Sequence, residues 1–160
     1  MQTLLIIGAG GHGRVVAEIA AACGYNKKSI AFLDDNALGA VGKIEEMDLY
    51  VPHYDGVFIA IGNNALRQSL TLQLSQINGA MLITLIHPTA YVSPSATIGQ
   101  GTVVEPKAVI NTNSRIGQGC IISVGTIIDH DCEIGEFCHI NAGMICSAGS
   151  HVEALSRISK

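Results

Sequence analysis

The sequence predicts two units of different fold class, an α/β unit over residues 1–88 and a parallel β-helix over residues 89–160. The first half alternates short apolar runs with segments of helical spacing, which is typical of a parallel sheet covered by helices. The second half places an aliphatic residue at every sixth position, which is typical of chains that wind into stacked coils. The pattern changes just after His87-Pro88, where the α/β half is predicted to end.

The elements of the α/β half follow from the length and spacing of its apolar residues. Strands are predicted for the apolar runs at residues 4–7, 30–33, 57–61 and 81–86. A helix is predicted over residues 14–23, with apolar residues on one face and Gly24 as its stop signal. Leucines at helical spacing predict a second helix over residues 66–77. This order of strands and helices predicts a small parallel sheet.

The β-helix follows from an unbroken six-residue repeat. Twelve positions from Val92 to Ile158 keep this interval, and eleven of them are Val or Ile. The residues two positions earlier are nearly all small. Because a unit of one short strand and one tight corner cannot bury itself, units must stack, and three of them form a triangular coil of about 18 residues. The period leaves the handedness open, although the usual crossover rule favours a right-handed coil.

Composition and charge exclude several function classes. The chain of 160 residues is 48% hydrophobic, which argues against disorder, and its net charge of −4 argues against a nucleic-acid partner. No apolar stretch approaches the roughly 18 residues of a membrane span, and residues 4–7 lack the basic flank of a signal peptide. These features predict a cytoplasmic protein.

The five cysteines are predicted to be reduced and to serve packing. They are odd in number and form no CxxC pair, which disfavours both a disulfide framework and a zinc site. Cys120, Cys132 and Cys138 occupy the small-residue position of the repeat, and Cys146 occupies an aliphatic position. We therefore expect no metal ion and no catalytic cysteine.

A glycine-rich segment between the first strand and the first helix predicts a nucleotide site. Gly8-Ala9-Gly10-Gly11-His12-Gly13 fits G-x-G-x-x-G, in which glycines allow a tight turn and let a phosphate approach the helix N-terminus, as in Rossmann-like units. Asp34 and Asp35 follow the second strand, where an acid can bind a ribose hydroxyl or a base. Because 88 residues hold only one mononucleotide-binding half, a nucleotide diphosphate fits better than NAD. The alternative is a turn that only packs.

A second candidate site is Asp129-His130-Asp131, which lies just after the in-phase Ile128. A carboxylate beside an imidazole raises its basicity, as a general base requires. The alternative is a solvated acidic corner with an incidental histidine. His139 lies nine residues later, half a coil away, and could meet His130 of a partner subunit; otherwise it is a surface or interface histidine.

These motifs resemble those of the hexapeptide-repeat, left-handed β-helix acyltransferases of bacterial sugar biosynthesis. The chain is most similar to the UDP-4-amino-sugar N-acetyltransferases of the UDP-N-acetylbacillosamine group, and the sialic acid O-acetyltransferases share the architecture. The resemblance rests on residues 7–13, 32–35, 58–64 and 129–139, which keep their order across nearly the whole chain.

The resemblance implies a homotrimer with active sites between subunits. It implies acetyl-CoA as the donor and a UDP-4-amino-4,6-dideoxy sugar of bacterial surface glycan biosynthesis as the acceptor. By the same resemblance His130 is the general base, Asp131 the acid that raises its basicity, and His139 and Ala148 lie at the acetyl-CoA site. The residues expected to hold the nucleotide sugar are Gly10, Gly11, His12, Asp34 and Asp35.

The sequence also departs from the family pattern in two ways. Ala148 stands where relatives often have glycine. Ile158 is still in phase near Lys160, whereas relatives continue for several coils that help to form the CoA pocket, so full acetyl-CoA affinity is expected to depend on such coils. Two other functions remain open: O-acetylation of a sugar such as sialic acid, and a nucleotide-sugar-binding trimer without activity. A purely structural β-helix is disfavoured, because its threonines share no 18-residue column.

Overall fold

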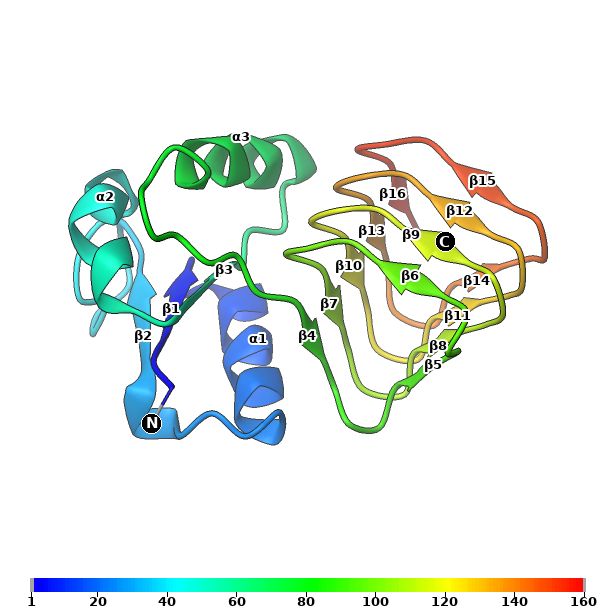
Figure 1. The fold of residues 1–160 in the computed structure, drawn as a ribbon, viewed down its shortest axis with the longest axis horizontal. Coiled ribbons are helices and arrows are strands. Elements are labelled where there is room, and N and C mark those ends of the chain that lie inside the picture. Colours follow the sequence, from blue (N-terminus) through cyan, green and yellow to red (C-terminus); the bar gives the residue numbers. More distant parts are fainter. Residues whose placement is uncertain (1, 160) are drawn as a thin grey trace. The chain divides into compact units, whose positions relative to one another are not determined.

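The predicted fold class is confirmed by the computed structural model, which describes residues 2–159 (Figure 1). The chain divides into two compact units, Met1–Ile83 and Thr84–Lys160. The first unit is a parallel sheet with helices, and the second is a parallel β-helix. No helix among residues 2–159 is long and apolar enough to cross a membrane.

The first unit is built on a three-stranded parallel sheet in the order β2-β1-β3. Its strands are β1 (Leu4–Ile7), β2 (Ile30–Leu33) and β3 (Gly56–Ile59), and all of β1 is buried. Its helices are α1 (Gly11–Ala22), α2 (Met47–Tyr50) and α3 (Asn64–Leu74), with 3₁₀ turns at Lys27–Ser29, Ile44–Glu46 and Val51–His53. The strands run parallel, so their carboxyl ends, and the loops that follow them, lie at one edge of the sheet.

The structure confirms β1 and β2 residue for residue and corrects other boundaries. Helix α1 begins three residues before the predicted start, because Gly10 already serves as its N-cap. The predicted strand over residues 81–86 is wrong. Leu82 makes a single parallel bridge to Val57, whereas Leu85–Ile86 forms β4 of the β-helix, in register with Val103. The apolar run therefore crosses from one unit into the next.

The β-helix consists of three parallel sheets, which we call the first, second and third faces. The first face contains β4, β7 (Val103–Val104), β10 (Ile121–Ile122), β13 (His139–Ile140) and β16 (Arg157–Ile158). The second contains β5 (Tyr91–Val92), β8 (Val109–Ile110), β11 (Ile127–Ile128) and β14 (Ile145–Cys146). The third contains β6 (Thr97–Ile98), β9 (Arg115–Ile116), β12 (Glu133–Ile134) and β15 (His151–Val152).

The core of the β-helix is formed by the in-phase residue of each strand, and the cysteines take part in it. Ser114 Oγ donates a hydrogen bond to the carbonyl oxygen of Asp129 at 2.6 Å. The thiols of Cys120 and Cys132, which occupy the same position in later repeats, point to the carbonyls of Gly135 at 3.1 Å and Ser147 at 3.2 Å. Each thiol thus replaces a hydroxyl in a repeated backbone contact, as expected for a packing role.

Three glycines of the third face let neighbouring coils stack closely. Gly99, Gly117 and Gly135 follow one another at the interval of one coil. A Cβ atom on Gly117 would lie 2.6 Å from the backbone nitrogen of Glu136, and one on Gly135 would lie 2.5 Å from that of Ala154. Any side chain at these positions would therefore push two coils apart.

Candidate functional site

The glycine-rich loop after β1 contains two pairs of glycines with different roles. Gly8 has a φ of +102°, and a Cβ atom there would lie 2.8 Å from Ile61 Cδ1. A Cβ on Gly13 would lie only 2.1 Å from the carbonyl oxygen of Gly8. In contrast, nothing lies within 4 Å of a Cβ built on Gly10 or Gly11. The chain itself thus requires Gly8 and Gly13, whereas Gly10 and Gly11 leave the start of α1 open to a ligand.

The N-terminus of α1 is suited to an anion. Its N-cap residue Gly10 provides no side-chain hydrogen bond, and the first turn contains no acidic residue. The first backbone N–H groups of a helix have no partner within the helix and carry partial positive charge. His12 is half-buried in this turn. This end of α1 is the place where the sequence predicts a phosphate.

Asp34 links the glycine-rich loop to the loop after β2. Its Oδ2 accepts a hydrogen bond from the backbone nitrogen of Ala9 at 2.8 Å, and its Oδ1 accepts from Asn36 at 2.9 Å and Ala37 at 2.8 Å. These bonds, above all that from Ala9, hold the pKa of Asp34 below its usual range. Asp35 is exposed, and its Oδ1 accepts from the backbone nitrogen of Ile44 at 3.1 Å. Asp34 is therefore placed to shape the loops, and Asp35 lies at the surface beside them.

A buried arginine at the same edge of the sheet was missed by the sequence analysis. Arg67 of α3 is 1% exposed, and it donates to the carbonyl of Ile61 at 2.8 Å and to Asn64 Oδ1 at 2.9 Å. Asn63 caps the same helix by accepting from the backbone nitrogen of Leu66 at 3.0 Å. Arg67 thereby holds the loop that follows β3. Nothing in the sequence distinguishes this arginine from one on the exposed face of a helix.

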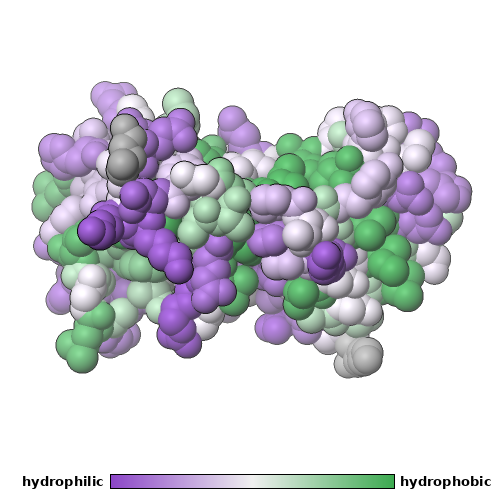
Figure 2. Space-filling model, turned by 90° about the horizontal axis from the view of Figure 1, so that it is seen from below, coloured by the Kyte–Doolittle hydropathy of each residue, from purple (hydrophilic) through white to green (hydrophobic). Residues whose placement is uncertain are grey.

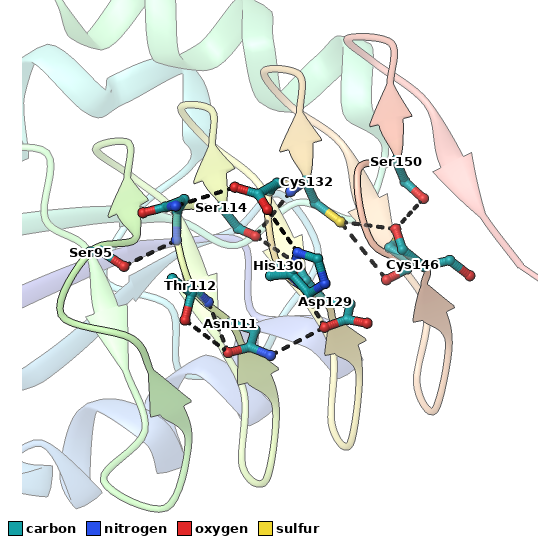
Figure 3. A network of polar contacts seen from close by, with 12 residues as sticks. Ser95, Asn111, Thr112, Ser114, Asp129, His130, Cys132, Cys146 and Ser150 are labelled. Atoms are coloured by element: carbon teal, nitrogen blue, oxygen red, sulfur yellow. Dashed lines mark hydrogen bonds and ion pairs between the residues drawn. The ribbon is translucent and has the colours of Figure 1, made fainter.

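The second candidate site lies at the corner between β11 and β12, where His130 and Asp131 form the turn. Asp131 Oδ2 lies 2.7 Å from His130 Nδ1, and Asp129 Oδ1 accepts from the backbone nitrogen of His130 at 2.8 Å (Figure 3). The His130 side chain is 53% exposed. With Nδ1–H donated to Asp131, Nε2 is the ring nitrogen that can take a proton from a ligand.

The charges around His130 make its imidazole more basic than usual. The hydrogen bond to Asp131 is the main cause that raises the pKa of His130 above 6.5, and the negative charge of Asp129 adds to it. The pKa of Asp131 is lowered, chiefly by the hydrogen bond with His130. The pKa of Asp129 is lowered as well, chiefly by the backbone N–H of His130. Both carboxylates are therefore charged when the imidazole titrates.

The two residues predicted to lie at the acetyl-CoA site occupy different parts of the β-helix. Ala148 is exposed in the turn one coil beyond His130, and the backbone nitrogen of the next residue, Gly149, donates to the carbonyl of His130 at 2.9 Å. His139 lies on β13 of the first face, with Nε2 3.3 Å from Ser123 Oγ. The structure thus brings Ala148 beside His130, but places His139 on another face.

A shallow groove surrounds His139. Ser123, Asn141, Met144 and Arg157 line it, and Arg157 Nε donates to Asn141 Oδ1 at 3.3 Å. Among residues 2–159, no group of three or more His, Cys, Asp or Glu side chains is arranged to hold a metal ion.

Comparisons with known proteins identify the family. Residues 3–74 match the PglD N-terminal domain. The acetyltransferase domain of PglB from Neisseria gonorrhoeae, in complex with acetyl coenzyme A, is 40% identical, with a TM-score of 0.92 over 98% of this chain and 78% of that chain. The chain belongs to the hexapeptide-repeat β-helix acyltransferases.

Two further proteins are similar to this chain. A mutant of perosamine N-acetyltransferase from Caulobacter crescentus, in complex with CoA and GDP-perosamine, is 33% identical, with a TM-score of 0.85 over 94% of this chain and 74% of that chain. UDP-N-acetylbacillosamine N-acetyltransferase of Bacillus subtilis (strain 168) is 38% identical over 114 residues, 64% of this chain. That match spans about half, 51%, of the curated relative.

Proposed function

We propose that the protein is an acetyl-CoA-dependent N-acetyltransferase that acylates the amine of a UDP-4-amino-4,6-dideoxy sugar for bacterial surface glycans. The observation that carries this proposal is the exposed imidazole of His130, held by Asp131 at 2.7 Å, in a chain of the acyltransferase family. The relatives support the proposed donor and class of acceptor, because one was solved in complex with acetyl coenzyme A and another is an N-acetyltransferase of a UDP-sugar.

His130 acts as the general base in this proposal. Its Nε2 accepts a proton from the sugar amine while the amine nitrogen forms a bond to the acetyl carbonyl carbon. Asp131 keeps Nδ1 protonated and stabilises the imidazolium that forms. The carbon–sulfur bond then breaks, and the proton on His130 is available to the departing thiolate of CoA. No covalent acyl-enzyme is needed, which agrees with the buried positions of four of the cysteines.

The nucleotide part of the acceptor is proposed to bind at the carboxyl edge of the three-stranded sheet. Gly10, Gly11 and His12 bring the diphosphate to the N-terminus of α1, where nothing occupies the space above the two glycines. Asp35 is exposed beside this loop and suits a ribose hydroxyl or a base. Asp34 contributes by holding the loops in place.

Acetyl-CoA is proposed to bind along the β-helix, near His139 and Ala148. The open groove around His139 and the exposed turn at Ala148 leave room for an elongated ligand. Because His139 lies on the first face and Ala148 lies in the turn between the second and third faces, a single site that uses both needs His139 from one subunit and Ala148 with His130 from another. The proposed active site is therefore shared between subunits.

A homotrimer satisfies this requirement, and the second face of the β-helix supports it. Its outward side chains form an apolar ladder: Tyr91, Ile127 and Ile145 are 54%, 40% and 64% exposed, and Val109 lies between them. Apolar side chains cover part of this surface in Figure 2, which is seen from below. The outward residues of the third face are instead polar: Thr97, Arg115, Glu133 and His151. An exposed apolar stripe of this kind suits contact with further copies of the chain.

A cytoplasmic location agrees with this proposal. Acetyl-CoA and nucleotide sugars are cytoplasmic metabolites, and none of the five cysteines forms a disulfide.

The decisive experiment is a CoA-release assay with acetyl-CoA and a panel of UDP-amino sugars, GDP-perosamine and sialic acid. Turnover that requires a UDP-4-amino sugar supports the proposal. Turnover only with GDP-perosamine would correct the nucleotide, and turnover only with sialic acid would replace N-acetylation by O-acetylation. Binding of a UDP-sugar without turnover of any acceptor would contradict the enzyme and favour a nucleotide-sugar-binding protein.

A further inference from the structure

The turn that contains His130 lies against the turn one coil earlier, and the two are joined side chain to side chain. Asn111-Thr112-Asn113 stacks on Asp129-His130-Asp131, with the backbone nitrogen of Asp131 donating to the carbonyl of Thr112 at 2.9 Å. Asn111 Nδ2 donates to Asp129 Oδ1 at 3.2 Å, and Asn113 Nδ2 donates to Asp131 Oδ1 at 3.2 Å (Figure 3). Each carboxylate therefore has an amide partner 18 residues earlier.

The pair formed by Asn113 and Asp131 acts on the imidazole ring itself. One oxygen of Asp131 accepts from Asn113, and the other lies 2.7 Å from His130 Nδ1. Because the two oxygens are fixed in one plane, a bond to the first restricts the direction of the second. Asn113 thus limits the rotation of the carboxylate on which the orientation of His130 depends.

Asn113 is itself held firmly. Its backbone nitrogen donates to Ser95 Oγ at 3.0 Å, one further coil away. Its φ is +58°, a left-handed conformation that asparagine adopts more readily than most residues, and Asp131 repeats this conformation one coil later. A continuous chain of hydrogen bonds therefore leads from Ser95 through Asn113 and Asp131 to His130.

We propose that Asn113 is a positioning residue for the reaction, which aligns Asp131 so that His130 keeps its Nδ1–H and presents Nε2 to the acceptor amine. The inference rests on the proposed function for its catalytic part only. An amide suits this role because it donates to a carboxylate without a titration of its own near neutral pH. A carboxylate at this position would repel Asp131.

The pKa of His130 reports directly on this alignment, because few titratable groups lie near the imidazole within the β-helix. The titratable groups that affect its pKa are Asp129 and Asp131. The turns one coil away on either side, residues 111–113 and 147–149, contain no charged or titratable side chain. A change at Asn113 therefore reaches His130 through Asp131.

The test compares two glycine variants at equivalent turn positions. Asn113→Gly removes the amide but keeps a residue that adopts positive φ without strain. Lys107→Gly is the matched control, because Lys107 has a φ of 62° and its backbone nitrogen donates to Thr89 Oγ1 at 3.3 Å, yet it lies at a different corner. The pKa of His130 is measured by NMR titration of the ligand-free protein, with the signal assigned by its loss in His130→Gln.

We expect Asn113→Gly to lower the pKa of His130 towards 6.5, because a misaligned Asp131 stabilises the imidazolium less. Lys107→Gly should leave this pKa unchanged. If Asn113 only stabilised the turn, Asn113→Gly would lower the thermal midpoint without moving the pKa of His130. An unchanged or higher pKa of His130 in Asn113→Gly would overturn the proposal. If Asp131 stays aligned without Asn113, it has lost one of its two donors, and its bond to His130 becomes stronger rather than weaker.

The kinetic part of the test separates this inference from the proposed function. In Asn113→Gly and Asn113→Asp, kcat should fall roughly 10-fold to 100-fold, as misalignment of a catalytic group does, with little change in the KM for acetyl-CoA. Lys107→Gly should keep the original kcat. If the original protein transfers no acetyl group, the proposed function fails, while the NMR titration still decides whether Asn113 aligns Asp131 and His130. A lowered pKa with an unchanged kcat would overturn the catalytic role of Asn113.

Discussion

The two units hold their candidate site residues by opposite means. In the first unit, glycines and buried side chains shape the loops after β1, β2 and β3, and the N-terminus of α1 presents backbone N–H groups. In the β-helix, the corners from Gly101 to Leu155 repeat a residue of positive φ every six positions, and one corner differs from the others by its side chains, Asp129, His130 and Asp131. We therefore expect substitutions of the loop glycines in the first unit to act by displacing the backbone. Substitutions at the corner of His130 should instead change the reaction rate and leave the fold intact.

The comparison is tested most severely by Gly13→Ala. The added Cβ would lie 2.1 Å from the carbonyl oxygen of Gly8, and a backbone atom cannot yield as a side chain can. We expect a loss of about 4 kcal/mol or more in the free energy of unfolding of the first unit. Thermal unfolding followed by circular dichroism measures it, with Gly11→Ala as the control. A midpoint equal to that of the control would show that the backbone of this loop is not rigid.

His130→Ala should give the opposite result, a large loss of activity without loss of fold. The side chain is 53% exposed, so its removal leaves the core untouched. Removal of a general base lowers kcat by about 10²-fold to 10⁴-fold. The CoA-release assay measures the rate, and thermal unfolding serves as the control. A near-normal rate would remove His130 from the mechanism.

Ile145→Asp tests whether the apolar second face joins subunits. Ile145 is 64% exposed in the single chain, and a charge there should weaken assembly at least about tenfold, or about 1.4 kcal/mol. Sedimentation velocity across a concentration series measures the change, with Thr97→Asp on the polar third face as the control. If Ile145→Asp stays as assembled as the control, subunits do not meet at this face.

Gly10→Ala sharpens the contrast within the glycine-rich loop. A Cβ there meets nothing within 4 Å, and the φ of Gly10 is −67°, so alanine fits without strain. The thermal midpoint should stay the same, while the KM for the nucleotide sugar rises about tenfold because the new methyl occupies the ligand's space. Equal KM values for Gly10→Ala and the original protein would mean that the diphosphate lies elsewhere.

The smallest predicted effect is the position of the acidic limb of the pH–rate profile. His130 must be neutral to accept a proton, so kcat/KM falls as pH decreases through its pKa. Because Asp131 and Asp129 raise that pKa, the limb should lie above pH 6.5, and it should move to lower pH in Asp131→Asn. Initial rates from pH 5 to 9 measure it. A limb below pH 6.5 in the original protein would contradict the raised pKa.

Sequence patterns predicted the features that repeat along the chain. The period of six places every in-phase residue of the β-helix, and the short apolar runs place β1 and β2. The apolar-run criterion fails at residues 81–86, because their apolar character satisfies both units. The register of Ile86 with Val104 assigns β4 to the β-helix, and Ile86 in fact lies one six-residue period before Val92. The start of helix α1 was predicted too late, because its first turn contains two glycines, and glycine has a low helix propensity.

The supports of the candidate sites were harder to predict. The carboxylate of Asp34 accepts hydrogen bonds from backbone nitrogens, and bonds of this kind leave no pattern in a sequence. Arg67 is buried although its residue type is usually exposed. The contact of Asn113 with Asp131 could, however, have been predicted, because a coil of about 18 residues places Asn113 in the same turn position one coil earlier.

The stacking of Asn111-Thr112-Asn113 on Asp129-His130-Asp131 also restricts how such a protein can change in length. Insertion or deletion of one repeat between the two turns would rotate His130 to another corner and separate it from Asn113. Only the gain or loss of a whole coil elsewhere along the axis keeps every supporting contact. A lineage built on this plan should therefore vary in steps of whole coils before or after the pair of turns, while the spacing between the two turns stays constant.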